Sequence, residues 1–229
     1  MKKSYLILSS LLVLTLAACS QEKPTSSEST TTTEQTSKQE ETESIKQEEV
    51  TSSSEESKQK KAEVVNKGDY YSVQGKYDEI IIANKHYPLS KNYNPGENHT
   101  AKIELLKLIA AMQEEGYAIS DDYSGFRNYE LQKKLYEKYV EEEGKEAADR
   151  ESARPGYSEH QTGLAFDLIN TDGDLVTEEK AAQWLLDHAA DYGFVVRYLK
   201  GKEKETGYMA EEWHLRYVGK EAKDIAASG

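Results

Sequence analysis

The stretch SEHQTGLAFD, residues 158–167, holds a histidine and, seven residues later, an aspartate. A second stretch, EEWH at residues 211–214, adds another histidine preceded by two glutamates. A catalytic zinc site needs three protein ligands, an open fourth position for water and a base that accepts a proton from that water. The candidates for these roles are His160, Asp167 and His214 as ligands and Glu211 as the base. Together the two stretches predict a hydrolytic zinc centre.

The pattern of apolar residues explains how two distant stretches can meet. Residues 163–169 alternate, so that in a strand Asp167 points away from the apolar face. In residues 213–218, His214 likewise lies opposite the apolar positions. If these strands are neighbours, Asp167 and His214 enter one cleft while their apolar partners fill the core. His160 precedes the first strand, where a loop can bring it to the same point.

Each of these residues also has an ordinary structural interpretation. His160 alone is compatible with a surface loop, and His214 alone with a half-buried histidine. Asp167 is different, because a buried carboxylate costs several kcal/mol unless it is paired or bound to a metal. The four positions together favour the metal site.

Helical and strand patterns follow one another along the rest of the folded part. Apolar spacing predicts helices over 100–115, 128–143 and 177–192, and strands over 79–83, 163–169, 194–198 and 213–218. In the first helix, Ile103, Leu106 and Ile109 lie at helical spacing. We therefore expect an α+β fold, in which a small and mostly antiparallel sheet carries the zinc site and is flanked by helices. Residues 200–209 are either a flap over the cleft or a plain connector.

The N-terminal part has the pattern of an export signal and a tether. Its apolar run is shorter than the roughly 20 residues of a membrane-spanning helix. The run ends in LAAC, residues 16–19, which resembles a bacterial lipobox; a plain secretory signal is the alternative. Lipidation of Cys19 would anchor the mature protein at the outer face of the cell membrane. We expect a lipoprotein signal peptide over 1–19, a disordered Ser/Thr/Glu-rich tether reaching into the cell wall over 20–66, and one domain over 67–229.

The composition argues against a nucleic-acid-binding protein and against a disulfide-stabilised or sulfur-ligated one. The 229 residues include 29 basic and 42 acidic ones, a net charge of -13. This balance argues against a nucleic-acid partner, which normally leaves a basic footprint on a protein. Because Cys19 is the only cysteine, disulfides within the chain are impossible and any metal site must use nitrogen and oxygen ligands.

The pattern SxHxxGxAxD at residues 158–167, with ExxH at 211–214, resembles the VanX/VanY-type zinc D-alanyl carboxypeptidases. Further matches are SGFR at residues 124–127 with Gln132, and residues 84–95, which resemble the "NK..PL...Y.P" stretch of the carboxypeptidase branch. The resemblance covers residues 70–219 and is closest to the LD-carboxypeptidases of streptococcal cell walls. It implies the fold that these enzymes share with DD-peptidases and the hedgehog signalling domain.

The resemblance implies a role for each matching residue. The implied ligands of one zinc ion are His160, Asp167 and His214. Glu211 is the implied base, with its neighbour Glu212 as the alternative. Arg127 would stabilise the substrate carbonyl as it becomes an oxyanion; its ordinary interpretation is a surface arginine at a helix start. The implied substrate-pocket residues are Ser158, Gln132 and Ser124.

The implied function is removal of a terminal D-alanine from peptidoglycan stem peptides by a monomer. An LD-carboxypeptidase cuts the L-Lys–D-Ala bond of tetrapeptides, and a DD-carboxypeptidase cuts the D-Ala–D-Ala bond of pentapeptides. We favour the first, although ligand spacing does not decide between them. A non-catalytic binding module with the same fold is a third possibility, and a solute-binding lipoprotein a fourth, for which the domain is too small.

Overall fold

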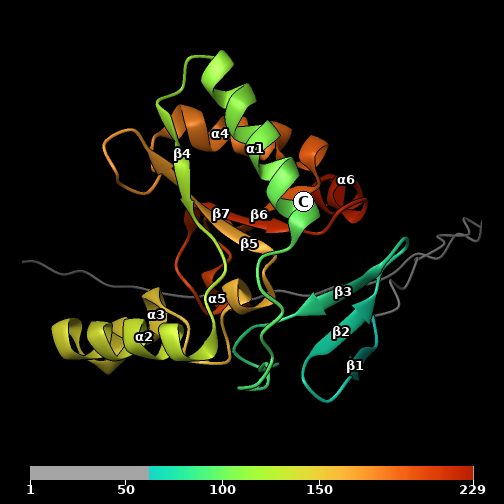
Figure 1. Cartoon of the computed structure of the whole chain (residues 1–229), viewed down its shortest axis with the longest axis vertical. Coiled ribbons are helices and arrows are strands. Elements are labelled where there is room, and N and C mark those ends of the chain that lie inside the picture. Colours follow the sequence, from blue (N-terminus) through green and yellow to red (C-terminus); the bar gives the residue numbers. More distant parts are fainter. Residues whose placement is uncertain (1–61, 229) are drawn as a thin grey trace, which may run out of the picture. The chain divides into compact units, whose positions relative to one another are not determined.

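The computed structural model describes residues 62–228 (Figure 1). The expected signal peptide over 1–19, with its lipidation residue Cys19, and the tether as far as residue 61 lie outside the described residues. Strand β1 (Val64–Asn66) lies before residue 67, so regular structure begins slightly earlier than the expected domain boundary. No helix within residues 62–228 is both long enough and apolar enough to cross a membrane.

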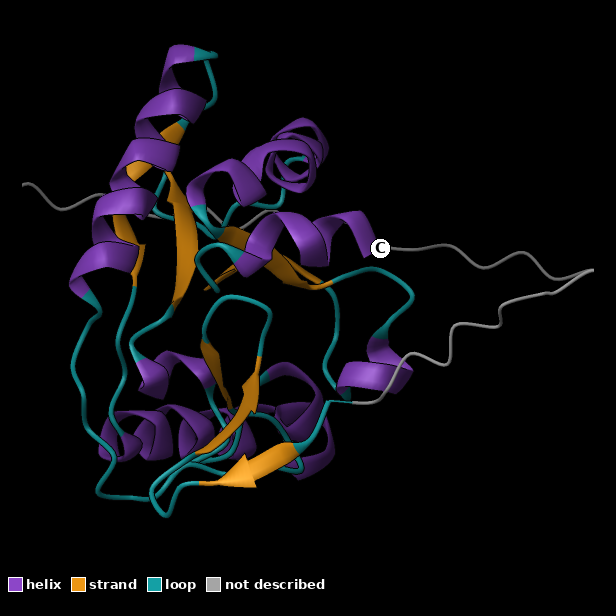
Figure 2. Cartoon of the chain, turned by 90° about the vertical axis from the view of Figure 1, so that its right-hand side faces the viewer, coloured by secondary structure: helices purple, strands orange, loops and turns teal. Residues whose placement is uncertain are grey.

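Two separate antiparallel sheets form the β part of the fold (Figure 2). The smaller sheet has the order β1-β2-β3, with β2 at Tyr71–Gln74 and β3 at Glu79–Ile82. The larger sheet has the order β4-β5-β7-β6. Its strands are β4 (Ile119–Ser124), β5 (Ala165–Asn170), β6 (Phe194–Tyr198) and β7 (Glu211–Tyr217). The predicted α+β class with antiparallel strands is therefore confirmed.

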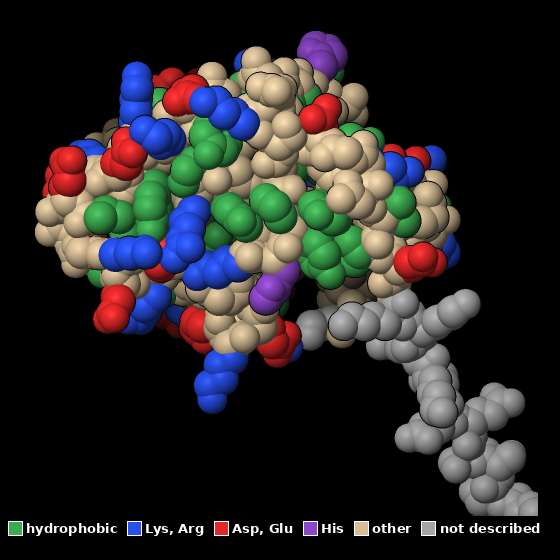
Figure 3. Space-filling view, turned by 90° about the horizontal axis from the view of Figure 1, so that it is seen from below, with side chains coloured by type: hydrophobic (Ala, Val, Ile, Leu, Met, Phe, Trp, Pro, Cys, Tyr) green, Lys and Arg blue, Asp and Glu red, His purple; other side chains and the backbone are tan. Residues whose placement is uncertain are grey.

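Helices lie on both sides of the larger sheet. Figure 1 shows α1 and α4 on one side of it and α2 and α3 on the other. The helices are α1 (His99–Glu114), α2 (Tyr129–Glu143), α3 (Lys145–Glu151), α4 (Glu179–His188), α5 (Glu203–Thr206) and α6 (Glu221–Ser228). Two 3-10 turns, η1 (Glu159–Thr162) and η2 (Ala189–Tyr192), precede β5 and β6. Figure 3 views the side of α2, α3 and the smaller sheet, where basic and apolar side chains lie beside one another.

The hydrophobic core lies between the larger sheet and the helices α1 and α4. Strand β5 contributes Phe166 and Leu168, and β7 contributes Leu215, all fully buried. These are the apolar positions that the alternating pattern assigned to the core face. The opposite face of the same strands carries Asp167 and His214. Burial of one face thus directs the polar residues of the other face toward α2 and α3.

The buried face of α1 differs from the one that the sequence suggested. Of the three residues at the predicted spacing, Ile109 is buried, whereas Ile103 and Leu106 are 41% and 42% exposed; Leu105 and Leu108 of the neighbouring stripe are buried as well. The helix carries two overlapping apolar stripes, and packing against the sheet selects the second one. The position of the helix was predicted correctly, but of the apolar residues named for it only Ile109 lies in the core.

Gly163 allows the stretch before β5 to pass close to the loop before α1. A β-carbon at this position would lie 2.0 Å from the carbonyl oxygen of Gly96, and the backbone has a φ of +72°. Only glycine tolerates both conditions. The Gly163 carbonyl also accepts a hydrogen bond from the amide of Asn98, the residue that caps α1. This contact fixes where η1 enters β5.

Candidate active site

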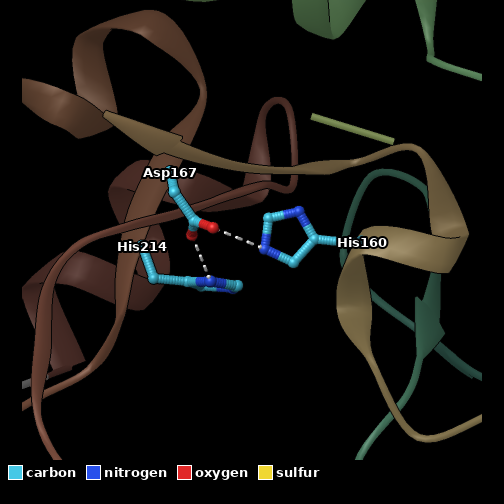
Figure 4. Close-up of side chains that lie close together, drawn as sticks. All are labelled: His160, Asp167 and His214. Atoms are coloured by element: carbon cyan, nitrogen blue, oxygen red, sulfur yellow. Dashed lines mark hydrogen bonds and ion pairs between the residues drawn. The ribbon is translucent and has the colours of Figure 1, made fainter. Parts of the chain in front are cut away.

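Three buried side chains, all predicted as metal ligands, meet at the centre of the larger sheet (Figure 4). The Asp167 carboxylate lies between the two imidazoles. One oxygen is 3.0 Å from Nδ1 of His214, and the other is 3.1 Å from Nε2 of His160. All three donor atoms lie within 4.8 Å of one another. Residues that are far apart in the sequence thus converge on one point.

Strand pairing explains this convergence. Asp167 on β5 and His214 on β7 are direct partners in the antiparallel register. His160 comes from η1, whose first turn is capped by Ser158, because the Ser158 hydroxyl accepts a hydrogen bond from the His160 amide. The cap holds His160 over the end of β5. Ser158 therefore has a local structural role in addition to any contact with substrate.

In each imidazole, one nitrogen faces Asp167 and the other contacts a hydrogen-bond acceptor outside the three-residue cluster. Nδ1 of His160 is 2.8 Å from the carbonyl oxygen of Gly125. Nε2 of His214 is 3.1 Å from the carboxylate of Glu159. A carbonyl and an ionised carboxylate only accept hydrogen bonds, so these two nitrogens must donate. The nitrogens in the cluster are then free to bind a metal, an arrangement that metal-ligating histidines usually show.

The three donors fit zinc. Tetrahedral zinc, with bonds of about 2.0–2.2 Å to nitrogen and oxygen, places its ligand atoms roughly 3.4 Å apart. The three donor atoms already lie within 4.8 Å of one another, so small side-chain adjustments bring them to that spacing. Two imidazoles and one carboxylate are also the donor types that zinc prefers when no cysteine is present. His160, Asp167 and His214 are therefore suited to hold zinc and leave a fourth position open.

Burial and neighbouring charges shift the pKa values of these ligands. Burial lowers the pKa of His160, which keeps this ring neutral. Burial also disfavours the charged form of His214, but the carboxylates of Asp167 and Glu159 outweigh it and raise the pKa of His214 to about 9. Burial opposes ionisation of Asp167 too, yet the two histidines hold its pKa well below the usual range. A cation at this point would displace the proton of His214, because metal ligands bind in their deprotonated forms.

Glu211 lies beside the ligand cluster. Its Oε2 is 3.5 Å from Nδ1 of His214. Burial raises the pKa of Glu211 to about 7, and the nearby charge of His214 counteracts part of that rise. A carboxyl group with a pKa near neutrality is well suited to exchange protons. Glu212, the alternative base, instead forms an ion pair with Lys200 at 2.9 Å.

Arg127 faces the cluster from the segment between β4 and α2. Its Nη1 is 3.5 Å from the Asp167 carboxylate. Ser124 accepts a hydrogen bond from Nη1 at 2.9 Å, and Gln132 accepts one from Nε at 3.2 Å. The Gln132 amide also donates to the carbonyl of Ala153, so both of its ends have protein partners. Ser124 and Gln132 thus orient Arg127, and their direct contact with substrate stays a prediction.

A cavity of about 270 Å³ opens over the cluster and is lined by the predicted residues Ser124, Arg127, Gln132, Ser158 and Glu211. Tyr198, Tyr208 and Trp213 form an aromatic wall. The Tyr198 ring lies 4.9 Å from the His214 ring and 5.3 Å from that of Tyr208.

Tyr208 belongs to the segment 200–209, the candidate flap. Two hydrogen bonds tie this segment to neighbouring elements, from Lys85 Nζ to the Gly207 carbonyl and from the Met209 amide to the Arg150 carbonyl. Movement of the segment as a flap stays a prediction.

Sequence reasoning missed Glu159 and its partners. Glu159 lies within SEHQTGLAFD and is almost fully buried. Arg197 on β6 contacts its carboxylate at 3.0 Å, and Arg216 on β7 lies 3.5 Å away. Two guanidinium groups hold the pKa of Glu159 well below its usual range, although burial opposes this. The available signal was Arg216, which shares a strand face with His214 and needs an acidic partner when buried.

Residues 96–220 match the family model described as VanY, D-alanyl-D-alanine carboxypeptidase. The chain belongs to the VanY family. The match spans α1 to β7 and includes every predicted site residue of the domain. The predicted resemblance to VanX/VanY-type enzymes is therefore confirmed.

Several relatives support this assignment. The crystal structure of the L,D-carboxypeptidase DacB from Streptococcus pneumoniae is 86% identical, covers 74% of this chain and 92% of its own, and has a TM-score of 0.73. A Zn(II) complex of a glutamate-to-alanine variant of VanY, a D,D-pentapeptidase of the VanB-type resistance cassette, is 32% identical. That match covers 64% of this chain and 92% of the VanY chain, with a TM-score of 0.56. The carboxypeptidase-like protein YodJ of Bacillus subtilis is 33% identical over 178 residues, or 67% of this chain; the chain spans 65% of YodJ.

Proposed function

We propose that this member of the VanY family is a zinc-dependent LD-carboxypeptidase, which cuts the L-Lys–D-Ala bond of peptidoglycan stem tetrapeptides and releases D-alanine. The observation that carries the proposal is the buried cluster of His160, Asp167 and His214, with Glu211 and Arg127 facing it across one cavity. Carboxypeptidase chemistry is common to the family, and 86% identity to the streptococcal L,D-carboxypeptidase favours the LD bond.

The hydrolysis divides into steps that the protein's own groups can perform. Zinc, when bound by the three ligands, polarises the scissile carbonyl and makes a water molecule more acidic. Glu211 accepts a proton from the attacking water, whose oxygen bonds to the carbonyl carbon. The Arg127 guanidinium donates hydrogen bonds to the carbonyl oxygen as negative charge develops there. Glu211 then passes the proton to the nitrogen of the departing D-alanine as the C–N bond breaks.

The surroundings of Arg127 and Glu211 support these roles. Ser124 and Gln132 fix two sides of the guanidinium, which leaves its remaining N–H groups for substrate. The aromatic wall partly excludes water from Glu211 and strengthens electrostatic interactions inside the cavity. Among residues 62–228, the three-ligand cluster is the one group of side chains that could hold a metal, which supports a single zinc ion.

The anchoring of the protein is part of the same proposal. We infer that Cys19 carries a lipid, so that a monomeric domain works at the outer face of the cell membrane and reaches the cell wall. The support is the LAAC stretch at residues 16–19, which ends an apolar run that is too short to span a membrane.

The competing function is DD-carboxypeptidase activity. It is favoured by the description of the family and by the D,D-pentapeptidase VanY, which is 32% identical. The cluster and Glu211 would serve either bond equally, so specificity depends on how the walls of the cavity accommodate the penultimate residue.

The test is to incubate the full chain with synthetic tetrapeptide and pentapeptide stems and to identify the products by mass spectrometry. We expect D-alanine from the tetrapeptide, none from the pentapeptide, and no product when a chelator is present. Release from the pentapeptide alone would establish the DD function. Absence of release from both would favour a non-catalytic binding module.

A further inference from the structure

Glu159 is a buried carboxylate that the proposed hydrolysis does not use. Its side chain is 5% exposed, and it is the first residue of η1, directly before the ligand His160. Three side chains converge on it. Nε2 of His214 is 3.1 Å from one oxygen, and Nε of Arg197 is 3.0 Å from the other. Nη1 of Arg216 lies 3.5 Å from that second oxygen.

The two arginines make a buried charge possible at this position. Leaving an isolated carboxylate inside a protein costs several kcal/mol, and paired guanidinium groups offset that cost. Arg216 is itself held by backbone carbonyls, since Nη2 donates to Ile81 and Nε donates to Tyr217. Ile81 belongs to β3, so the smaller sheet helps to keep the Arg216 guanidinium beside Glu159.

An ionised carboxylate at this position controls the imidazole of His214. Because it can only accept hydrogen bonds, it requires the proton of the neutral ring to be on Nε2. In the metal-free protein a second proton on Nδ1 meets the Asp167 carboxylate, 3.0 Å away, and a bound metal would take the place of that proton. Turning the ring over would replace both of these contacts with carbon atoms. Glu159 and Asp167 therefore hold the ring from two sides.

We propose that Glu159 is the positioning residue that fixes His214 as a metal ligand through Nδ1, with Arg197 and Arg216 holding the carboxylate in place. This inference rests on the proposed zinc function. It assigns to the second residue of SEHQTGLAFD a role distinct from those of Ser158 before it and His160 after it.

Glu159→Gln tests the inference, because the amide keeps the shape of the side chain but no longer enforces one tautomer of His214. We expect the zinc affinity of the full chain, measured by competition with a chromophoric chelator, to fall by about 10- to 100-fold. With Co²⁺ in place of zinc, the visible absorption spectrum should shift, because it reports the ligand geometry. At saturating zinc, kcat for the tetrapeptide should fall while KM stays within about twofold of the wild-type value.

Glu212→Gln is the matched control. Its carboxylate lies on the same strand as His214 but pairs with Lys200, so zinc affinity, cobalt spectrum and kcat should equal those of the wild type. The inference is wrong if Glu159→Gln folds, as judged by circular dichroism, and retains wild-type zinc affinity and an unchanged cobalt spectrum.

A second variant covers the case in which Glu159→Gln does not fold. The Arg197 side chain is 31% exposed, so Arg197→Gln is better tolerated and leaves Glu159 in place with one partner fewer. We expect zinc affinity to fall by roughly threefold or more in this variant; an unchanged affinity would overturn the inference. If the wild type itself neither binds zinc nor releases D-alanine, the proposed function is contradicted instead.

Discussion

Glu211 lies three residues before His214 on β7 and faces the same cleft. Its Oε2 is 3.5 Å from Nδ1 of the His214 imidazole. In a regular strand, residues three apart point to opposite faces. The exception arises from an irregularity in the pairing of β6 with β7. Between the pairs Val196–Leu215 and Tyr198–Glu211, β6 contributes one residue and β7 contributes three. Such bulges re-aim side chains beside active sites, and this one brings the glutamate to the histidine.

The position of Glu211 predicts that it is needed for turnover but not for metal binding. Glu211→Gln removes the proton acceptor and keeps the size of the side chain, so kcat should fall by about 100- to 10,000-fold. Bound zinc, measured by elemental analysis of the full chain, should stay at the wild-type level. Glu212→Gln is the control and should keep full activity, because Glu212 pairs with Lys200 outside the cluster. Full activity of Glu211→Gln would remove this residue from the mechanism.

Substitution of Arg127 should lower the rate of hydrolysis more than it lowers the stability of the fold. Arg127→Lys keeps the charge, but one ammonium group cannot reproduce the rigid fork that meets Ser124 and Gln132 at the same time. We expect kcat for the tetrapeptide to fall by about 100- to 1,000-fold, with the thermal midpoint nearly unchanged. Arg150→Lys, an exposed substitution on α3, is the control. A rise in KM without a fall in kcat would indicate that Arg127 binds the ground state instead.

Removal of the metal should lower stability without unfolding the domain. The contacts of Asp167 with both histidines, at 3.0 and 3.1 Å, can form without a cation. A ligand present at 1,000 times its Kd adds about 4 kcal/mol to the free energy of unfolding. A chelator should therefore lower the thermal midpoint, leave the far-UV circular dichroism unchanged and abolish activity, and added zinc should reverse these effects. A thermal midpoint that changes with neither chelator nor zinc would argue against a metal at this cluster. So would a midpoint of Asp167→Asn that changes with chelator and zinc as much as that of the wild type.

The sequence was sufficient to predict which faces of β5 and β7 carry the residues of the cluster. Alternation in β5 and β7 separates one apolar face from one polar face, and burial of the apolar face leaves Asp167 and His214 on the other. It was not sufficient for α1, where two apolar stripes overlap. Leu105 and Ile103 are equally apolar, and only the shape of the sheet surface buries the first and exposes the second.

The support of the cluster was predictable only in part, because Arg216 indicates a buried acidic partner but nothing in the sequence identifies that partner as Glu159. Glu159 has no periodic pattern, and its partners Arg197 and Arg216 approach it only once β6 and β7 have paired. The position of Glu211 beside His214 likewise depends on an irregularity in strand pairing that no spacing rule specifies. Spacing identified the chemistry of the ligands, whereas their positioning depends on tertiary contacts.

Asp149 on α3 gives a prediction about pH and stability. Its carboxylate accepts hydrogen bonds from Arg154, at 2.7 and 2.6 Å, and from the Tyr136 hydroxyl at 2.7 Å. The bonds from Arg154 are the largest influence and hold the pKa of Asp149 below its usual range in the folded state. The unfolded chain therefore binds a proton more readily at this residue. The stabilisation is fully present above the unfolded pKa of about 4 and is lost as the pH falls through the lower folded pKa.

We expect Asp149→Asn to be less stable than the wild type at pH 7 by about 1 kcal/mol in urea unfolding, because the bonds from Arg154 lose their charge assistance. As the pH falls from 5 to 3 this difference should begin to shrink, because the unfolded wild-type chain takes up a proton at Asp149 while the folded chain, with its lower pKa, does not. Asp172→Asn, in the exposed turn after β5, is the control and should follow the wild type throughout. A difference that stays constant across this range would show that Asp149 stabilises the link between α2 and α3 through shape and neutral hydrogen bonds, and not through its charge.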